Sequence, residues 1–134
     1  MTDTKLDLDT LTLAKGNHHD RSNGLCAMEA VAWLAGEKHN DQPDCVSPVI
    51  GAFVRRWNDD LGDNDRQKLK PILPTLIGTA ADLKTESRRA WMVTDWMVRT
   101  YMPAWLDLAG LTEQATAVRG LPELRSSQAR QRRI

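Results

Sequence analysis

The side chains best suited to chemistry are concentrated in one quarter of this chain, residues 16 to 48. This stretch holds every histidine and cysteine of the 134-residue sequence, namely His18, His19, His39, Cys26 and Cys45. It also holds Glu29, the one charged residue in the apolar run from residue 25 to residue 35. Imidazole, thiolate and carboxylate groups bind zinc, and they also act as nucleophiles and bases. These residues therefore allow two chemical interpretations, a zinc site and a cysteine nucleophile, besides a purely structural one.

The first interpretation is a zinc site. Zinc in proteins takes four tetrahedral ligands, and the metal ligands we consider are His18, His19, Cys26, His39 and Cys45. The intervals from His19 to Cys26, from Cys26 to His39 and from His39 to Cys45 contain 6, 12 and 5 residues. None of them is the short paired spacing that makes zinc motifs specific. Zinc is the only cofactor that the residues indicate, and a cluster without metal stays open as the alternative.

The second interpretation makes Cys26 a nucleophile. If Asn23 caps the following helix, Cys26 falls in its first turn, where the helix dipole lowers the pKa of a thiol. A histidine such as His19 would be the base, and Glu29 could orient it. The Gly-x-Cys at residues 24 to 26 is similar to the start of the catalytic helix in papain-like and bacteriocin-processing cysteine peptidases. Those families place the remaining catalytic residues on strands, which the helical second half of this chain does not provide.

The structural interpretation explains Cys26 as a small buried hydrophobe, because cysteine is among the most buried residue types. It explains Glu29 less easily. Glu29 follows Cys26 by three residues and shares its helix face, and a buried carboxylate is costly unless it is paired, hydrogen-bonded or bound to metal. We expect its partner to be an arginine, the backbone N–H groups of the loop from residue 16 to residue 23, or a metal. Our hypothesis is that Glu29 ties the histidine-rich loop to the helix.

Capping residues and apolar periodicity predict about five helices. We expect a buried helix over residues 24 to 35 and an amphipathic one over residues 48 to 60 that starts at Ser47-Pro48. Pro71 and Pro74 divide the next helix into two short pieces with a bend. A long helix from residue 86 to residue 108, capped by Thr85 and rich in Trp and Met, is expected to be the second wall of the core. A short helix over residues 112 to 120 ends the folded part.

The predicted fold class is therefore mainly α, a single compact helical domain with a short N-terminal extended or β segment. Residues 1 to 13 are expected to form an extended arm or a strand, since their leucines alternate. The helical domain is expected to span residues 14 to 122. Residues 123 to 134 are rich in arginine and lack apolar periodicity, which is typical of a basic flexible tail.

The composition of the chain limits the classes of partner that can be expected. Lys plus Arg and Asp plus Glu each number 18, so the chain has no overall charge to attract nucleic acid or an acidic membrane. The long helix is interrupted by charged residues too often to span a membrane. The N-terminus lacks the pattern of a secretion signal, which indicates a cytoplasmic, reducing location in which a disulfide between Cys26 and Cys45 is not expected. A protein partner is expected, and a second copy of the same chain, giving a homodimer, is one possibility.

Several runs together, GNHH, GLCAMEAVAWLAGE, PDCVSPVIGAFVRRWND and PAWLDLAGLTEQA, resemble a group of small uncharacterised proteins of actinobacterial genomes and phages. The resemblance spans about residues 14 to 120 and brings no activity, cofactor or catalytic residue. It implies a small intracellular protein, in a setting where inhibition of host factors is a frequent role. We therefore predict a non-enzymatic protein–protein interaction module, of the kind that phages use to inhibit or modulate a host or defence protein. Its Cys/His/Glu cluster is structural or zinc-supported, and a cysteine-dependent hydrolase using Cys26 is the alternative.

Overall fold

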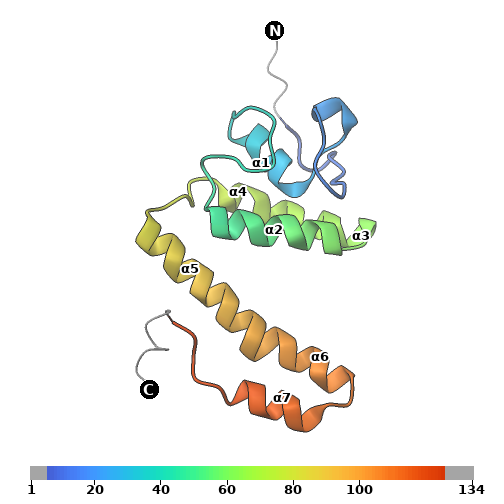
Figure 1. Ribbon diagram of the computed structural model, residues 1–134. Helices are drawn as coiled ribbons and strands as arrows, with labels where there is room; N and C mark the ends of the chain where they lie inside the picture. Colours follow the sequence, from blue (N-terminus) through green and yellow to red (C-terminus); the bar gives the residue numbers. More distant parts are fainter. Residues whose placement is uncertain (1–5, 126–134) are drawn as a thin grey trace. The chain divides into compact units, whose positions relative to one another are not determined.

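The computed structural model describes residues 6–125, and helices form the regular structure of these residues (Figure 1). The elements, in chain order, are η1 (Arg21–Asn23), α1 (Ala27–Leu34), α2 (Pro48–Asp60), α3 (Asp63–Arg66), η2 (Gln67–Ile72), α4 (Leu73–Leu76), α5 (Leu83–Trp96), η3 (Met97–Tyr101), α6 (Met102–Leu108) and α7 (Thr112–Arg119). The described residues contain no strand. The prediction of a mainly α fold is confirmed.

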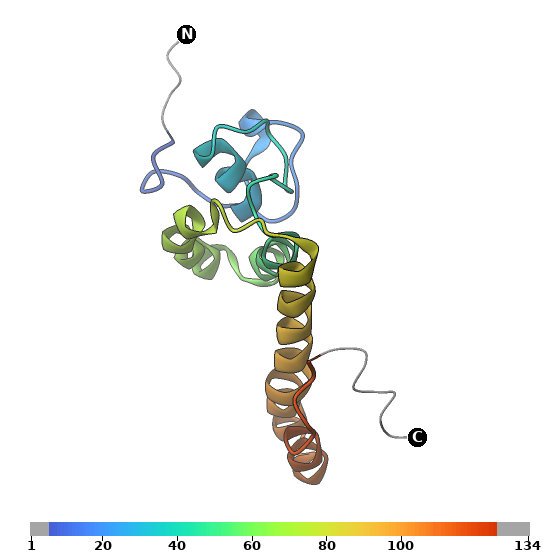
Figure 2. The same cartoon turned by 90° about the vertical axis from the view of Figure 1, so that its left-hand side faces the viewer.

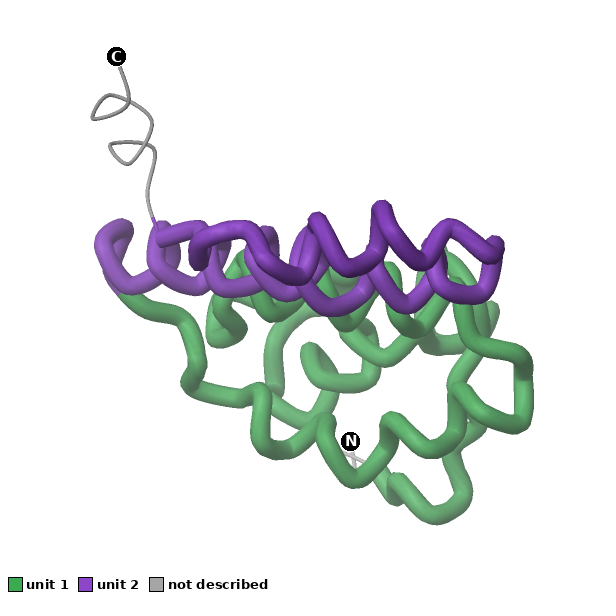
Figure 3. The backbone as a smooth tube through the Cα atoms, turned by 90° about the horizontal axis from the view of Figure 1, so that it is seen from below, with its two compact units in different colours: residues 1–81 green, residues 82–134 purple. Residues whose placement is uncertain are grey.

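These helices belong to two compact units, residues 1–81 and residues 82–134, which Figure 3 colours separately. They are called unit 1 and unit 2 below. The short pieces α3, η2 and α4 follow one another directly, three pieces where the two prolines predicted two, and α5, η3 and α6 form one continuous helical run (Figure 2). With these runs each counted once, the described residues hold the five main helices that the sequence predicted. Most of the predicted basic tail, residues 126–134, lies outside the described residues, as do residues 1–5.

Helix α1 is the centre of unit 1, as its apolar sequence predicted. Six of its eight residues are buried, and it contacts both α2 and α4. The buried apolar residues that pack around it come from the arm, from the loop before α2, and from α2, η2 and α4: Leu13, Val46, Val54, Leu69, Leu73 and Leu76. Removing one such leucine side chain from water contributes about 1.5–3 kcal/mol, so this layer holds unit 1 together.

Helix α1 begins at Ala27, three residues later than predicted. Cys26 is its N-cap instead of Asn23, because the Cys26 Sγ accepts the N–H of Glu29 at 3.4 Å. Glu29 Oε1 in turn accepts the N–H of Cys26 at 2.9 Å. This reciprocal pair is a capping box in which a thiol takes the place of the usual hydroxyl. Cys26 therefore lies before the first turn and not within it.

The N-terminal segment from Leu6 to Leu13 is an arm, and the strand alternative is not found. A turn interrupts the segment where the leucine alternation slips, since Asp7 accepts the N–H of Asp9 through its carboxylate and that of Leu11 through its carbonyl oxygen. The arm is held by the Gln67 side chain, which accepts the N–H of Leu13 at 2.8 Å and donates to its carbonyl oxygen at 2.9 Å. A side chain thus satisfies the backbone that a neighbouring strand would otherwise pair.

Helix α2 has the bounds that the sequence predicted, with Ser47 as its cap and Pro48 as its first residue. Its fully buried Asn58 connects three segments. Asn58 Oδ1 accepts the N–H of Ala27 at the start of α1, and Asn58 Nδ2 donates to the carbonyl oxygen of Ala14. The start of α1 is therefore fixed from both sides, by its own capping box and by α2.

Unit 2 consists of the run α5–η3–α6 and of α7, which packs against α6 and η3. Helix α5 begins at Leu83 and not at residue 86, because Asp82 is the residue whose side chain accepts a first-turn N–H, that of Thr85, at 2.8 Å. Residues Met97–Tyr101 form a π turn. Within residues 6–125, no helix combines the length and the apolar composition needed to cross a membrane.

Candidate functional site

The carboxylate of Glu29 is the centre of the predicted cluster, and its side chain is only 1% exposed. His18 reaches it twice, through its backbone N–H to Oε2 and through its ring Nδ1 to Oε1, both at 2.8 Å. The N–H of Cys26 is a third donor, to Oε1. The hypothesis that Glu29 ties the histidine-rich loop to α1 is therefore confirmed, and backbone N–H groups are among the partners as expected.

His39 also lies against the carboxylate, and it comes from the loop between α1 and α2. Its Nε2 is hydrogen-bonded to the carbonyl oxygen of His18 at 2.8 Å and lies 2.9 Å from Glu29 Oε2. The imidazole therefore links the second loop to the first and places its ring beside the carboxylate. The other ring nitrogen, Nδ1, is buried and has no hydrogen-bond partner among the described residues.

Gly24 shapes the other side of the His18 ring. It has φ of 127°, and a Cβ added there would lie 3.0 Å from His18 Nε2. An L-residue would meet both an unfavourable backbone conformation and the imidazole. The glycine thus allows the loop to close over His18 while Nδ1 points at Glu29.

Two opposing effects act on the pKa of Glu29. Burial by itself would raise it, but the hydrogen bonds from the His18 side chain and from the backbone N–H groups of Cys26 and His18 hold the pKa below its ordinary value of 4.5. The carboxylate is therefore ionised at neutral pH, and three nitrogens are hydrogen-bonded to it. An ionised group with its acceptor positions filled in this way holds segments together and is not poised to take up a proton.

Cys26 does not have the environment of a nucleophile. It is buried, its sulfur accepts the N–H of Glu29, and burial together with the neighbouring carboxylate raises the pKa of the thiol to about 12. The lowered pKa that the hydrolase alternative needs is thus opposite in direction to the one found. The reason is the shift in helix start, which turns Cys26 into a cap beside an anion.

His19 and Cys45 do not join the cluster. The His19 side chain is exposed, with Nδ1 3.6 Å from Asp20 Oδ2. Cys45 belongs to another loop contact, in which its N–H donates to Glu37 Oε2 and its carbonyl oxygen accepts the N–H of Gly78. Of the five predicted metal ligands, only His18, His39 and Cys26 surround Glu29.

The chemistry that these groups offer a metal is limited by their contacts with one another. Across residues 6–125, no group of three or more His, Cys, Asp or Glu side chains is arranged to hold a metal ion. His18 Nδ1 and His39 Nε2 are both directed at the Glu29 carboxylate. Zinc binding stays a prediction that only a metal assay can test.

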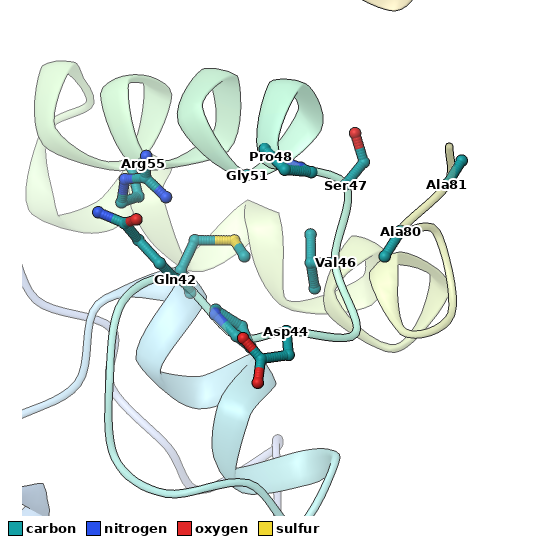
Figure 4. Close-up of a pocket in the computed structure, with 11 residues that line it drawn as sticks. Gln42, Asp44, Val46, Ser47, Pro48, Gly51, Arg55, Ala80 and Ala81 are labelled. Carbon is teal, nitrogen blue, oxygen red and sulfur yellow. The ribbon is translucent and has the colours of Figure 1, made fainter. Parts of the chain in front are cut away.

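A cavity of about 330 Å³ lies in unit 1, between the loop before α2, α2 itself and the segment after α4 (Figure 4). Met28 and Val46 line it with apolar atoms. Arg55 and Asp44 contribute one cation and one anion, and Arg55 Nη1 also donates to the carbonyl oxygen of Asp41 at 3.1 Å. The lining includes no histidine or cysteine, so the cavity is separate from the cluster. The sequence did not predict this cavity, although Gly51, which lines it, is a glycine inside a helix and could have indicated a close approach.

The apolar side chains of the long helical run in unit 2 form the most exposed apolar surface of the described chain. They were predicted to line the core, and this prediction is wrong. Only Pro103 and Ala115 are buried among the described residues of unit 2. Five large side chains from Met97 onward are each between 43% and 80% exposed, and we call them the unit 2 face: Met97, Tyr101, Met102, Trp105 and Leu108. Met92 is also exposed, but it precedes Met97 by five residues within α5 and is therefore turned about 140° away from it.

The π turn explains why these residues share a side of the helix. In a π turn residues five apart lie above one another, and the N–H of Met102 bonds to the carbonyl oxygen of Met97 accordingly. The rings of Trp96 and Tyr101, five residues apart, stack with centroids 5.2 Å apart. Tyr101 then meets Trp105 edge to face at 6.1 Å. An uninterrupted α-helix would have turned Trp96 away from the other two rings.

Comparisons of the chain with protein-family models, with curated proteins and with solved structures find no match. The function has to be argued from the geometry described above.

Proposed function

We propose that this protein is a non-enzymatic protein–protein interaction module, in which the unit 2 face contacts the partner and unit 1 is a rigid body fastened by the Glu29 cluster. The observation that carries the proposal is the exposure of five large apolar side chains on one side of a helix, in a unit of which only two of the described residues are buried. Monomeric proteins rarely expose a contiguous apolar patch of more than a few hundred Å², and larger ones mark interaction sites.

The composition of the unit 2 face supports the same conclusion. Tyr, Trp and Met are enriched in the centres of protein interfaces, where aromatic rings supply area and the flexible thioether of Met adapts to the partner. The face contains two methionines, Met97 and Met102, besides Tyr101 and Trp105. The stacking of Tyr101 on Trp96 restricts its ring before any partner binds, so less side-chain entropy is lost on association.

The Glu29 cluster has a structural role in this proposal. It joins two loops and the start of α1 around one buried anion, and the raised pKa of Cys26 keeps its thiol protonated. An intracellular setting and phage-type modulation of a host or defence protein are implied by the sequence resemblance alone.

Site-specific photocrosslinking tests the proposal. The photoreactive residue p-benzoylphenylalanine replaces Leu108 in the unit 2 face, and in a matched control it replaces Leu83, which is 88% exposed at the start of α5. In cells that express the chain, irradiation is expected to give discrete protein adducts from position 108 and not from position 83. Equal adducts from both positions, or none from position 108, would contradict the proposal.

A further inference from the structure

We propose that the partner of the unit 2 face is a second copy of this chain, so that the protein associates as a homodimer through α5, η3 and α6. This inference rests on the proposed function, since it names the occupant of the same surface. It follows from the area of the face, from its charge and from its shape.

The area reaches what a specific dimer needs. A large apolar or aromatic side chain presents about 200 Å² when fully accessible, so a half-exposed one offers about 100 Å². The five residues of the unit 2 face therefore present about 500 Å². Two copies would bury about 1,000 Å² in total, which is the area that a specific interface has to reach. One copy thus offers the area that an equal copy needs.

The charges around the face are already neutralised within the chain. Between residues 92 and 111 the charged residues are Asp95, Arg99 and Asp107. Arg99 binds Asp95 through two hydrogen bonds of 2.6 and 2.8 Å, and Asp107 pairs with Arg119. Two copies therefore meet without repulsion between like charges. A strongly charged partner, such as nucleic acid or an acidic peptide, would find no unpaired cation in this segment.

The shape of the face suits a helix of the same kind. The run from Met92 to Leu108 rises about 24 Å at 1.5 Å per residue, which is long enough for two helices to pack side by side. Asp95 accepts the N–H of Leu124 at 2.8 Å, so the segment after α7 returns along the Asp95 side of the helix. The segment after α7 covers the Asp95 side of the helix, whereas the Met and aromatic side chains of the unit 2 face stay exposed among the described residues of unit 2.

Molar mass in solution tests the inference on the full chain. Size-exclusion chromatography with light scattering is run from about 1 to 200 μM, with circular dichroism to verify that each variant is folded. These concentrations bracket the micromolar range in which weak dimers form. The wild type is expected to reach twice its 15.1 kDa mass. Leu108→Lys is expected to return the mass to that of one chain, while the control Leu83→Lys leaves it doubled. A wild type that stays at one chain, or a dimer that survives Leu108→Lys, would overturn the inference.

The dye 1-anilinonaphthalene-8-sulfonate, which binds exposed apolar surface, separates this failure from failure of the proposed function. If the wild type is monomeric yet binds the dye, and Leu108→Lys weakens dye binding while Leu83→Lys does not, the face is open to a different protein. The homodimer is then wrong and the interaction module survives. If the monomer binds no dye, the face is covered within the chain, and both the homodimer and the module are wrong.

Discussion

Replacing Glu29 by Gln is the most informative change in unit 1, because it keeps the shape of the side chain and removes the charge. In the wild type, Oε1 accepts from Cys26 N and is bonded to the His18 ring Nδ1, while Oε2 accepts from His18 N and lies 2.9 Å from His39 Nε2. A backbone N–H therefore points at each oxygen, and an amide NH₂ at either position would face that donor with a donor. At least one hydrogen bond is lost in either orientation, and the others weaken because their partner is no longer charged.

The expected magnitude follows from the loss of one such bond and the weakening of two. A hydrogen bond to a charged group contributes about 1.5–3 kcal/mol, and one between neutral groups about 0.5–1.5 kcal/mol. We therefore expect Glu29→Gln to lower the free energy of unfolding of unit 1 by about 3–5 kcal/mol. Domains of this kind are stable by only about 5–15 kcal/mol, so a large part of the stability is at stake.

Urea unfolding, followed by circular dichroism and by amide hydrogen exchange over α1, measures this loss. The matched control is Glu37→Gln, since the Glu37 carboxylate also accepts two backbone N–H groups, those of Asp44 and Cys45, but in a partly exposed loop. The control is expected to lose less than about 1 kcal/mol. A loss for Glu29→Gln within about 0.5 kcal/mol of zero, or equal to that of the control, would refute the structural role of the cluster.

Four further predictions concern the same cluster. Because the folded-state pKa of Glu29 is held below 4.5, its contribution to stability is complete above pH 4.5 and is lost as the pH falls through the folded value. The melting temperature of the wild type should thus fall toward that of Glu29→Gln below pH 4.5, and a constant difference between the two would contradict this. Cys26, with a thiol pKa of about 12, should react with iodoacetamide at pH 7.5 only after unfolding. Rapid alkylation of Cys26 in the native chain would revive the hydrolase alternative. Gly24→Ala should lower the free energy of unfolding, measured in urea, by about 1–3 kcal/mol. Gly62→Ala, with open space around its Cβ, should change it by less than about 1 kcal/mol. Equal effects of the two substitutions would refute the close approach of Gly24 to His18. Removal of metal by a chelator should leave the melting temperature unchanged, because hydrogen bonds already engage the Glu29 carboxylate. If the protein instead contains stoichiometric zinc and unfolds when the zinc is removed, a metal takes the place of those bonds.

The sequence predicted those features that depend on neighbouring residues. Ser47-Pro48 specified the start of α2, and the apolar run around Glu29 predicted both a buried helix and a carboxylate in need of partners. The loop N–H donors to Glu29 were expected for the same reason. Such features follow from capping and burial, which act over a few residues.

Features that depend on distant contacts could not be predicted in this way. His39 reaches Glu29 across a loop, and nothing in its own neighbourhood distinguishes it from the exposed His19. The apolar residues of unit 2 have the helical spacing of a core, and a sequence pattern does not show whether another layer covers them. The π turn at Met97–Tyr101, which aligns the rings, has no established sequence signature.

Methionine oxidation tests most directly whether a protein partner covers the unit 2 face. Met97 and Met102 are exposed in the free chain, while Met28 is fully buried and is the internal control. A Leu83→Met variant supplies an exposed reference for the oxidant dose. Oxidation by peroxide is measured by mass spectrometry in expressing cells and in the dilute purified chain. We predict that the two face methionines, scaled to position 83, are protected at least about tenfold in cells, as expected for a face covered nine-tenths of the time or more. Equal scaled oxidation in both samples would contradict the interaction module.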